Sequence, residues 1–263
     1  MKLGVVGAGG SMGRALVRAT ANAPDATLSA ASERTGSEWI GADAGSLAGI
    51  SAQGVAISDD PSAFAGCDAV LDFTVPAVSA AIAERLAETS TAHIIGTTGL
   101  DEAHEARIAK AAERTAIVKS GNMSLGVNLL AALVRQAAKA LPGADIEVLE
   151  MHHRRKVDAP SGTALLLADA AAQGRDVALA EQAVFAREGQ TGPRAAGTIG
   201  FATLRGGTVI GEHDIILALD GERIRLGHIA ENRELFANGA VTAARWSQSK
   251  PPGLYSMADV LGV

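Results

Sequence analysis

The first half of the chain alternates between short apolar runs and amphipathic segments, and this order constrains the fold more than any other feature. The runs have the length of buried strands and lie at 3–6, 27–31, 69–73, 93–95 and 116–118. Helical patterns follow three of them, at 12–22, 76–88 and 101–114, and Pro76 suits a helix start because its missing N–H is not needed there. Strands that alternate with such helices form a parallel sheet with helices on both faces. We therefore predict an α/β fold that begins with a Rossmann-like, doubly wound parallel sheet.

The second half follows a different pattern. An apolar helix is expected at 125–141, a strand at 145–151, a helix at 163–173, strands at 198–205, 208–219 and 223–229, and a last helix at 231–245. A Gly-Gly pair and Asp220-Gly221 separate the last three strands, and we interpret them as hairpin turns. The sequence thus predicts a first domain over 1–124, completed by 231–263, and an inserted α+β domain over 125–230.

Composition narrows the class of protein. A chain of 263 residues with 48% hydrophobic and 20% charged residues is globular, with a large buried core. A net charge of −6 argues against a general nucleic-acid binder. The single cysteine, Cys67, excludes an intrachain disulfide and a cysteine-based metal cluster. Neither a secretory signal nor a membrane span is recognisable, so we expect a cytoplasmic protein without a membrane partner.

A glycine-rich loop follows the first predicted strand and opens the first predicted helix. Its sequence over 7–14 is GAGGSMGR, in which glycines permit a tight turn and let a phosphate approach backbone N–H groups. The spacing is GxxGxxG and not the strict GxGxxG. Glu33 follows the second strand, where an acid can bind ribose hydroxyls, and Arg34 next to it can meet a 2′-phosphate. The alternative is an ordinary glycine turn beside a surface ion pair.

Other readings of these motifs fit less well. Residues 9–13 match the GxSxG elbow of serine hydrolases, but that elbow needs earlier strands, and only eight residues precede Gly9. The chain has no Gly-Lys pair, which excludes a Walker-type phosphate loop. His104-Glu105 begins a zinc-protease pattern, but Ile108 stands where the second histidine is required, so we predict no metal site.

Two further segments lie at predicted strand ends, where open parallel sheets bind their ligands. They are GTTG at 96–99 and GNMS at 121–124, whose small and hydroxyl residues leave room for a flat ring. An ordinary turn is an equally open interpretation of each.

The most unusual segment is a basic run, HHRRK, at 152–156 of this acidic chain. It follows a predicted strand and precedes DAPSGT at 158–163, which reads as a helix start. The N–H groups of Gly162 and Thr163 and the nearby cations suit a small dicarboxylate. Crowded cations also lower the proton affinity of Lys156 and the histidines, towards useful acid strength. The alternative is a solvated basic turn paired with Asp158.

Taken together, these motifs resemble the 4-hydroxy-tetrahydrodipicolinate reductase family, formerly called dihydrodipicolinate reductase, nearly from end to end. The most specific match is EMHHRRKVDAPSGTAL at 150–165, and GNMSLGVN at 121–128 supports it. The resemblance implies an oxidoreductase of the diaminopimelate route to lysine. It would reduce a cyclic imine-type dicarboxylate to tetrahydrodipicolinate with a hydride from NADH or NADPH and loss of water. Members are usually homotetramers joined through the sheet of the second domain, which also binds substrate.

The resemblance also implies residue roles. His152 and Lys156 would handle protons, and His153, Gly162 and Thr163 would bind the substrate carboxylates. The cofactor would contact Gly7, Ala8, Gly9, Gly10, Ser11, Met12, Glu33, Arg34, Gly96, Thr97, Thr98, Gly121, Asn122, Met123 and Ser124. Many relatives carry arginine at the position of Ser11, so this difference bears on the preference for NADPH.

Two other functions use the same first domain. A cofactor-sensing protein would have degraded substrate residues, whereas His152, Lys156 and the Ser-Gly-Thr turn are present. A paralogous oxidoreductase of another small acid would give no reason for HHRRK followed by APSGT.

Overall fold

Two units make up the chain. The computed structural model describes residues 1–263, apart from the side chain of residue 61. Unit 1 comprises Met1–Leu125 and Glu234–Gly262, and unit 2 comprises Gly126–Arg233 with Val263. None of the helices in the described part of the chain combines the length and apolar character needed to cross a membrane.

Unit 1 is built on a seven-stranded sheet in which every neighbouring pair is parallel. Its strands are β1 (Lys2–Val6), β2 (Thr27–Ser32), β3 (Ile57–Ser58), β4 (Ala69–Asp72), β5 (Ala92–Ile95), β6 (Ala116–Lys119) and β12 (Gly253–Tyr255). They lie in the order β12-β6-β5-β4-β1-β2-β3. The chain order reverses beside β1, and such a switch point is where doubly wound sheets bind ligands, outside the carboxyl ends of the strands.

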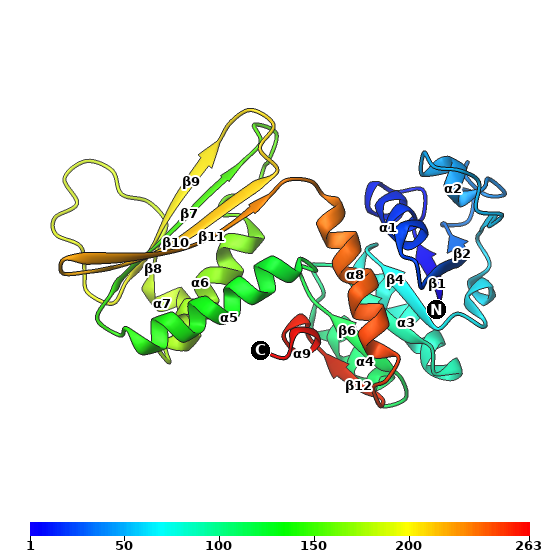
Figure 1. Cartoon of the computed structure of the whole chain (residues 1–263). Coiled ribbons are helices and arrows are strands. Elements are labelled where there is room, and N and C mark those ends of the chain that lie inside the picture. Colours follow the sequence, from blue (N-terminus) through cyan, green and yellow to red (C-terminus); the bar gives the residue numbers. More distant parts are fainter. The chain divides into compact units, whose positions relative to one another are not determined.

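Helices cover both faces of this sheet (Figure 1). The long ones are α1 (Ser11–Asn22), α3 (Pro76–Thr89), α4 (Glu102–Ala112) and α8 (Glu234–Ser247), and the short ones are α2 (Ala44–Leu47), the 3₁₀ helix η1 (Pro61–Phe64) and α9 (Met257–Leu261). One apolar cluster joins α1 and α8 to the strands, and a second joins α3 and α4 to β5 and β6. The predicted doubly wound fold is therefore confirmed.

Unit 2 is a five-stranded mixed sheet. Its elements are α5 (Leu125–Ala140), β7 (Asp145–His152), α6 (Gly162–Gly174), α7 (Leu179–Gln182), β8 (Ala183–Val184), β9 (Ile199–Arg205), β10 (Gly211–Leu219) and β11 (Glu222–Ala230). The order is β11-β10-β7-β9-β8. α5 and α6 pack on one face, and among the described residues no helix covers the other, which we call the open face (Figure 1).

The central strand β7 decides which side chains enter the core. Ile146, Val148, Glu150 and His152 are buried, whereas the residues between them are more exposed, as the two-residue period of a strand requires. The first two join the apolar core. Glu150 and His152 continue the same row at the carboxyl end of the strand, so β7 carries two polar side chains into a buried position.

One predicted turn is wrong. β9 does not form a hairpin with β10 at Gly206-Gly207, because β7 lies between them and pairs parallel with β9 and antiparallel with β10. The glycines instead cross the end of β7, where Gly206 N–H donates to the His152 carbonyl at 2.9 Å and Arg154 N–H to the Gly207 carbonyl at 3.3 Å. In this central place, the backbone of β7 is hydrogen-bonded to β9 and β10, and its buried apolar row packs against α5 and α6. The turn at Asp220-Gly221 does join β10 and β11 as predicted.

The C-terminal tail, beyond the last predicted helix, forms two further elements. It forms β12, which pairs with β6 at the edge of the unit 1 sheet, and then α9. Ser256 caps α9, because its hydroxyl accepts from the Asp259 N–H while the Asp259 carboxylate accepts from the Ser256 N–H.

Candidate active site

The glycine-rich loop of unit 1 is closely packed. Gly7 has a φ of +68°, a conformation that favours glycine. A Cβ on Gly13 would lie 1.9 Å from the Gly7 carbonyl oxygen, so only glycine lets α1 pass this close to the end of β1. Both positions are therefore fixed by the backbone path.

The start of α1 is open to an anion. Gly10 is the N-cap residue and provides no side-chain cap, the first turn holds no acidic residue, and Ser11 is exposed. The first N–H groups of a helix have no partner within the helix, and its N-terminus carries partial positive charge. This geometry fits a phosphate of a dinucleotide.

Glu33 lies against the glycine loop. Its Oε1 accepts a hydrogen bond from Gly9 N–H at 2.9 Å. Arg14 donates from Nε to the Gly9 carbonyl at 2.9 Å and stacks over the Trp39 ring at 5.2 Å. A Cβ on Gly9 would lie 2.6 Å from the Trp39 ring. Arg34 is exposed beside this group.

A cavity of about 480 Å³ opens beside the loop. Its lining includes Gly7, Gly10, Glu33, Arg34, Phe73 and Val75. Its size is typical of a small-molecule site, and it combines an apolar wall with a few polar groups. The residues present therefore fit the adenosine end of a dinucleotide.

The two segments that follow β5 and β6 hold their own backbone in place. A Cβ on Gly96 would lie 2.4 Å from the Phe73 ring, and the Thr97 hydroxyl, which is buried, accepts from the Ser79 hydroxyl at 2.7 Å. In the next segment, the Asn122 side-chain oxygen accepts from Ser124 N–H at 2.8 Å, and Met123 is buried. The exposed parts are Thr98, Gly99 and Gly121.

In unit 2, a buried polar cluster lies at the carboxyl end of β7. His152 Nδ1 is 2.5 Å from Glu150 Oε2. Arg205 of β9 donates two hydrogen bonds to the same carboxylate, at 2.9 and 3.1 Å, and Ser161 N–H donates a third at 3.1 Å. Burial acts to raise the pKa of the Glu150 carboxyl, but Arg205, His152 and Ser161 outweigh it and hold that pKa below its usual value.

A second buried histidine completes this cluster. His213 Nε2 is 3.0 Å from the Ser161 hydroxyl, and its ring stands edge-on to that of His152 with centroids 5.1 Å apart. Burial, assisted by the neighbouring His152, lowers the pKa of His213 to about 4. His213 is therefore neutral at neutral pH.

The basic run follows His152 directly and connects to the cluster through Asp158. Lys156 Nζ donates to Asp158 Oδ1 at 2.8 Å, and Arg205 donates to the Asp158 carbonyl at 2.7 Å. His153 Nε2 lies 3.2 Å from an Arg233 nitrogen and therefore accepts from it. Burial and the nearby Arg233 lower the pKa of His153, so this histidine is neutral and the arginine carries the charge.

The start of α6 joins the same cluster. Ser161 is the N-cap residue, and its hydroxyl accepts from Ala164 N–H at 3.1 Å. Gly162 is exposed and Thr163 half-buried in the first turn. Ser161 links this helix start to Glu150 and His213, and Glu150 links it to His152, so the start of α6 lies beside the histidines of the cluster.

Comparison with known proteins agrees with this geometry. The family models for the N-terminus and the C-terminus of dihydrodipicolinate reductase match residues 1–123 and 126–261. The chain belongs to the dihydrodipicolinate reductase family. It is therefore an oxidoreductase with a nicotinamide cofactor, and the family predicted from its motifs is confirmed.

Similar proteins span the whole chain. A 4-hydroxy-tetrahydrodipicolinate reductase of Brucella melitensis is 58% identical in an alignment that covers 100% of this chain and 99% of the relative. One of Allorhizobium ampelinum is 59% identical in an alignment that covers 100% of this chain and 98% of the relative. Among solved structures, a dipicolinate-bound dihydrodipicolinate reductase from Paenisporosarcina shares 21% identity with a TM-score of 0.80 and covers 98% of both chains. At that identity, the last match shows the fold alone.

Sequence reasoning missed three members of the cluster in this dihydrodipicolinate reductase family protein. Glu150 was within reach, because it lies two residues before His152 and a strand places such pairs on one face. Arg205 and His213 come from β9 and β10, and no local signal connects them to β7. Trp39 also carries no motif that would place it at the glycine loop.

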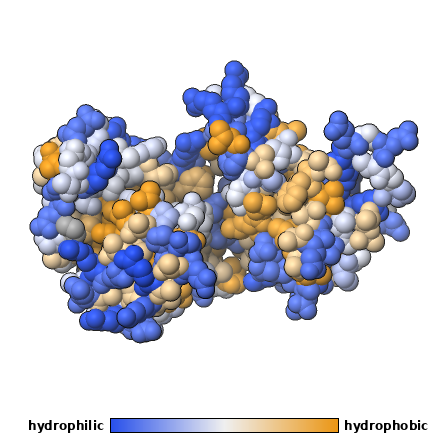
Figure 2. Space-filling view, turned by 180° about the vertical axis from the view of Figure 1, so that it is seen from behind, coloured by the Kyte–Doolittle hydropathy of each residue, from blue (hydrophilic) through white to orange (hydrophobic). Residues whose placement is uncertain are grey.

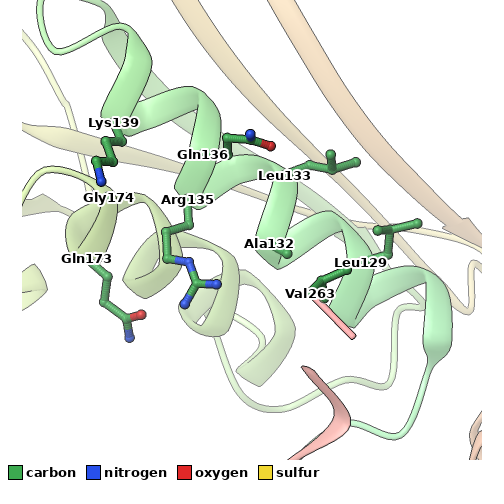
Figure 3. Close-up of a pocket in the computed structure, with 9 residues that line it drawn as sticks. All are labelled: Leu129, Ala132, Leu133, Arg135, Gln136, Lys139, Gln173, Gly174 and Val263. Atoms are coloured by element: carbon green, nitrogen blue, oxygen red, sulfur yellow. The ribbon is translucent and has the colours of Figure 1, made fainter. Parts of the chain in front are cut away.

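A further hollow of unit 2, about 530 Å³, lies outside this site. It runs along α5 past Leu129, Leu133 and Lys139 to Gln173 and Gly174 at the end of α6 (Figure 3). A Cβ on Gly174 would lie 2.3 Å from the Arg135 carbonyl, so the helices touch there. None of the predicted site residues lines this hollow.

Proposed function

We propose that this chain reduces 4-hydroxy-tetrahydrodipicolinate to tetrahydrodipicolinate with NADH or NADPH and loss of water, in the diaminopimelate route to lysine. The observation that carries the proposal is the cluster of His152, Lys156 and the α6 start. Glu150 contacts His152 and the α6 start, Asp158 contacts Lys156, and Arg205 bonds to both Glu150 and Asp158. It combines proton-handling groups with a helix N-terminus suited to a carboxylate. Family membership supports the same reaction.

Unit 1 holds the cofactor in this proposal. The bound nicotinamide supplies the hydride. The open start of α1 and residues Gly7 to Met12 bind its phosphates, Glu33 accepts from the ribose hydroxyls, and Arg34 binds a 2′-phosphate. The segments Gly96–Thr98 and Gly121–Ser124 follow β5 and β6 at the same edge of the sheet, and we assign them to the nicotinamide side.

Unit 2 holds the dicarboxylate. The first turn of α6, with Gly162 and Thr163, binds one carboxylate through backbone N–H groups and the helix dipole. His153 and Arg233 form a donor pair for a carboxylate, in which the arginine provides the positive charge. The exposed cations around this site attract an acidic substrate to an otherwise acidic protein.

Protons are handled by His152 and Lys156. Because His152 Nδ1 is engaged by Glu150, its Nε2 is the nitrogen that can exchange a proton with substrate. Lys156 carries three donors, and Asp158 orients it. A positioned acid of this kind accelerates a reaction by roughly 10²–10⁴-fold.

We further propose a homotetramer that assembles through the open face of the unit 2 sheet. On this face, Leu204 pairs with Met151, and Ile229 lies two strands away in the same row. Leu204 is 48% and Ile229 68% exposed, which is unusual for large apolar side chains on a regular sheet. Figure 2 shows hydrophobic residues between hydrophilic ones over the part of the surface in view.

A reductase that consumes NAD(P)H works where this cofactor is regenerated, so we propose a cytoplasmic location.

The reaction can be tested directly. The purified protein is coupled to a source of the dihydrodipicolinate precursor, and the absorbance of the reduced nicotinamide is followed with NADH and with NADPH. We expect oxidation that depends on the precursor. If neither cofactor is oxidised although both bind, the cofactor-sensing alternative replaces this proposal; if only another small acid is reduced, the paralogue alternative does.

A further inference from the structure

We propose that Glu150, held by Arg205, is the positioning residue of His152: it fixes which imidazole nitrogen carries the resident proton and turns Nε2 towards the substrate. The proposal rests on the proposed function in one respect, namely that His152 is the residue that exchanges a proton with substrate. The contact between the two side chains and its surroundings carry the argument.

Glu150 and His152 are placed together by the strand itself. They lie two residues apart on β7, on the face that packs against the helices, and both are buried. Glu150 is only 1% exposed, and its Oε2 is 2.5 Å from His152 Nδ1. The His152 carbonyl accepts from Gly206 N–H, which fixes the backbone at this point. The ring therefore has little freedom to turn.

The carboxylate is kept ionised by its other partners. Arg205 binds it through two nitrogens, and Ser161 N–H donates to Oε1. An ionised carboxylate can only accept hydrogen bonds. The proton between Glu150 and His152 must therefore reside on His152 Nδ1, and in the neutral ring Nε2 is the free acceptor. When the ring gains a second proton, Nε2 is the site that takes it and can give it up.

The surroundings of Nε2 are kept open. A Cβ on Gly211 would lie 3.0 Å from His152 Nε2, so any side chain there would crowd this nitrogen. The His213 ring meets His152 edge-on and is neutral at neutral pH, so it does not repel a charged His152. His228 lies opposite His213 on β11, and burial lowers its pKa as well.

The remaining charges near His152 are largely paired with one another. Lys156 is bound to Asp158, and Arg205 to Glu150. Of the acidic groups in the described part of the chain, Glu150 is the one in direct contact with the His152 ring. A carboxylate in this position orients the ring, in the way that the buried aspartate of a catalytic triad does.

The first test measures the tautomer without any substrate. In protein labelled with ¹⁵N histidine and held at a pH where the ring is neutral, we expect His152 to show a protonated Nδ1 and an unprotonated Nε2. The signal is assigned by its loss in His152→Gln. In Glu150→Gln, the amide can donate as well as accept, so this preference should weaken or reverse. A neutral His152 ring that carries its proton on Nε2 in the native protein would overturn the proposal, whatever the protein reduces.

The second test is the pH profile of kcat/KM with the dihydrodipicolinate precursor. Removing an opposite charge next to an imidazole disfavours its charged form, so the alkaline limb in Glu150→Gln should move to lower pH by about 1–3 units. We expect kcat to fall by roughly 10–10⁴-fold while the KM for substrate changes little, because the residue acts through the ring. An unchanged profile in this variant would contradict the proposal.

Two controls separate positioning from folding. Glu147→Gln removes the same charge from the same strand, but Glu147 pairs with Arg187 and Arg194 on the open face, so the profile should keep its native midpoint. The double variant Glu150→Gln/Arg205→Met also removes the arginine charge that Glu150→Gln leaves unpaired. The double variant should show the same shifted pH profile as Glu150→Gln. A return to native activity would show that Glu150 serves only to neutralise Arg205. A native protein that shows the expected tautomer but reduces nothing would count against the proposed function and not against this inference.

Discussion

Within the basic run, Lys156 is held by an ion pair: its Nζ donates to Asp158 Oδ1 at 2.8 Å. If it donates a proton during reduction, Lys156→Ala should lower kcat by roughly 10²–10⁴-fold. The affinity for NADH should stay the same, since the cofactor loop belongs to unit 1. Steady-state kinetics and a cofactor titration by fluorescence measure the two effects. Arg154→Ala removes an equal charge from an exposed neighbour and should cost much less; equal losses in both variants would show that Lys156 only contributes to the local field.

The choice of cofactor depends on opposing residues. In the proposed cofactor site, Glu33 would accept from the ribose of NADH but repel a 2′-phosphate, whereas Arg34 would offer that phosphate a planar fork of donors. Ser11 adds no charge. A charged hydrogen bond contributes roughly 1.5–3 kcal/mol, and about 1.4 kcal/mol is tenfold in affinity. We expect both cofactors to serve within about tenfold, with NADH favoured if either is.

Variants of these residues test that balance. Arg34→Ala should raise the KM for NADPH selectively, and Ser11→Arg should lower it, with the KM for NADH as the internal control in each case. A native protein that rejects NADH by about a hundredfold would contradict the assignment of Glu33 to the ribose.

His213 gives the protein a pH-dependent stability. Its pKa in the folded state is about 4, against an ordinary value of 6.5. The unfolded chain therefore binds this proton more readily, and the contribution of His213 to stability is complete above about pH 6.5 and is lost as the pH falls towards 4. The loss amounts to about 3 kcal/mol. Urea unfolding at several pH values should show a shallower dependence in this window for His213→Gln than for the native protein; equal slopes would refute the assignment.

At the scale of elements, the link between β1 and α1 depends on Gly13. Its Cβ would lie 1.9 Å from the backbone oxygen of Gly7, and neither backbone can move without opening the loop. Gly13→Ala should therefore weaken NADH binding by at least about tenfold and lower the melting temperature. Gly143→Ala is the matched control, because nothing lies within 4 Å of the added methyl group. Native-like binding by Gly13→Ala would show that α1 does not hold the cofactor.

The elements that sequence predicted best are those whose signals are local. The strands of unit 1 are apolar on both faces, and Pro76 and the glycine loop mark where helices begin, so β1, α1, β2, β4, α3, β5, α4 and β6 lie where they were expected. The short elements between β2 and β4, which are α2, β3 and η1, were not predicted. The partner of β9 could not be predicted from neighbouring residues. Gly206-Gly207 resembles a hairpin turn that would pair β9 with β10, but β7, which is distant in sequence, lies between these two strands. The same limit applies to the candidate site. His152 and Lys156 stand in one motif, whereas Arg205 and His213 reach it only through the sheet.

At the scale of the whole molecule, the chain leaves unit 1 and returns to it. The returning helix α8 packs against α1, where Arg18 bonds to Glu234 at 3.0 Å and Arg245 to Asp25 at 2.6 Å. A Cβ on Gly239 of α8 would lie 1.8 Å from the Met123 carbonyl, next to the segment assigned to the nicotinamide. The C-terminal part of unit 1 thus packs against a segment that precedes unit 2 in the chain, so unit 1 is completed only after the chain has passed through unit 2.

The open face of unit 2 should be buried in the assembled protein. A large apolar side chain gains about 1.5–3 kcal/mol when it leaves water, and a symmetric tetramer repeats each interface residue in every copy. Ile229→Lys should therefore dissociate the tetramer, which sedimentation velocity at fixed protein concentration will measure. Leu254→Lys changes a side chain of similar size that is 45% exposed on β12 of unit 1, and it should leave the tetramer intact. A native protein that sediments as a monomer at micromolar concentration would contradict the proposed assembly, and dissociation by Leu254→Lys alone would move the interface to unit 1.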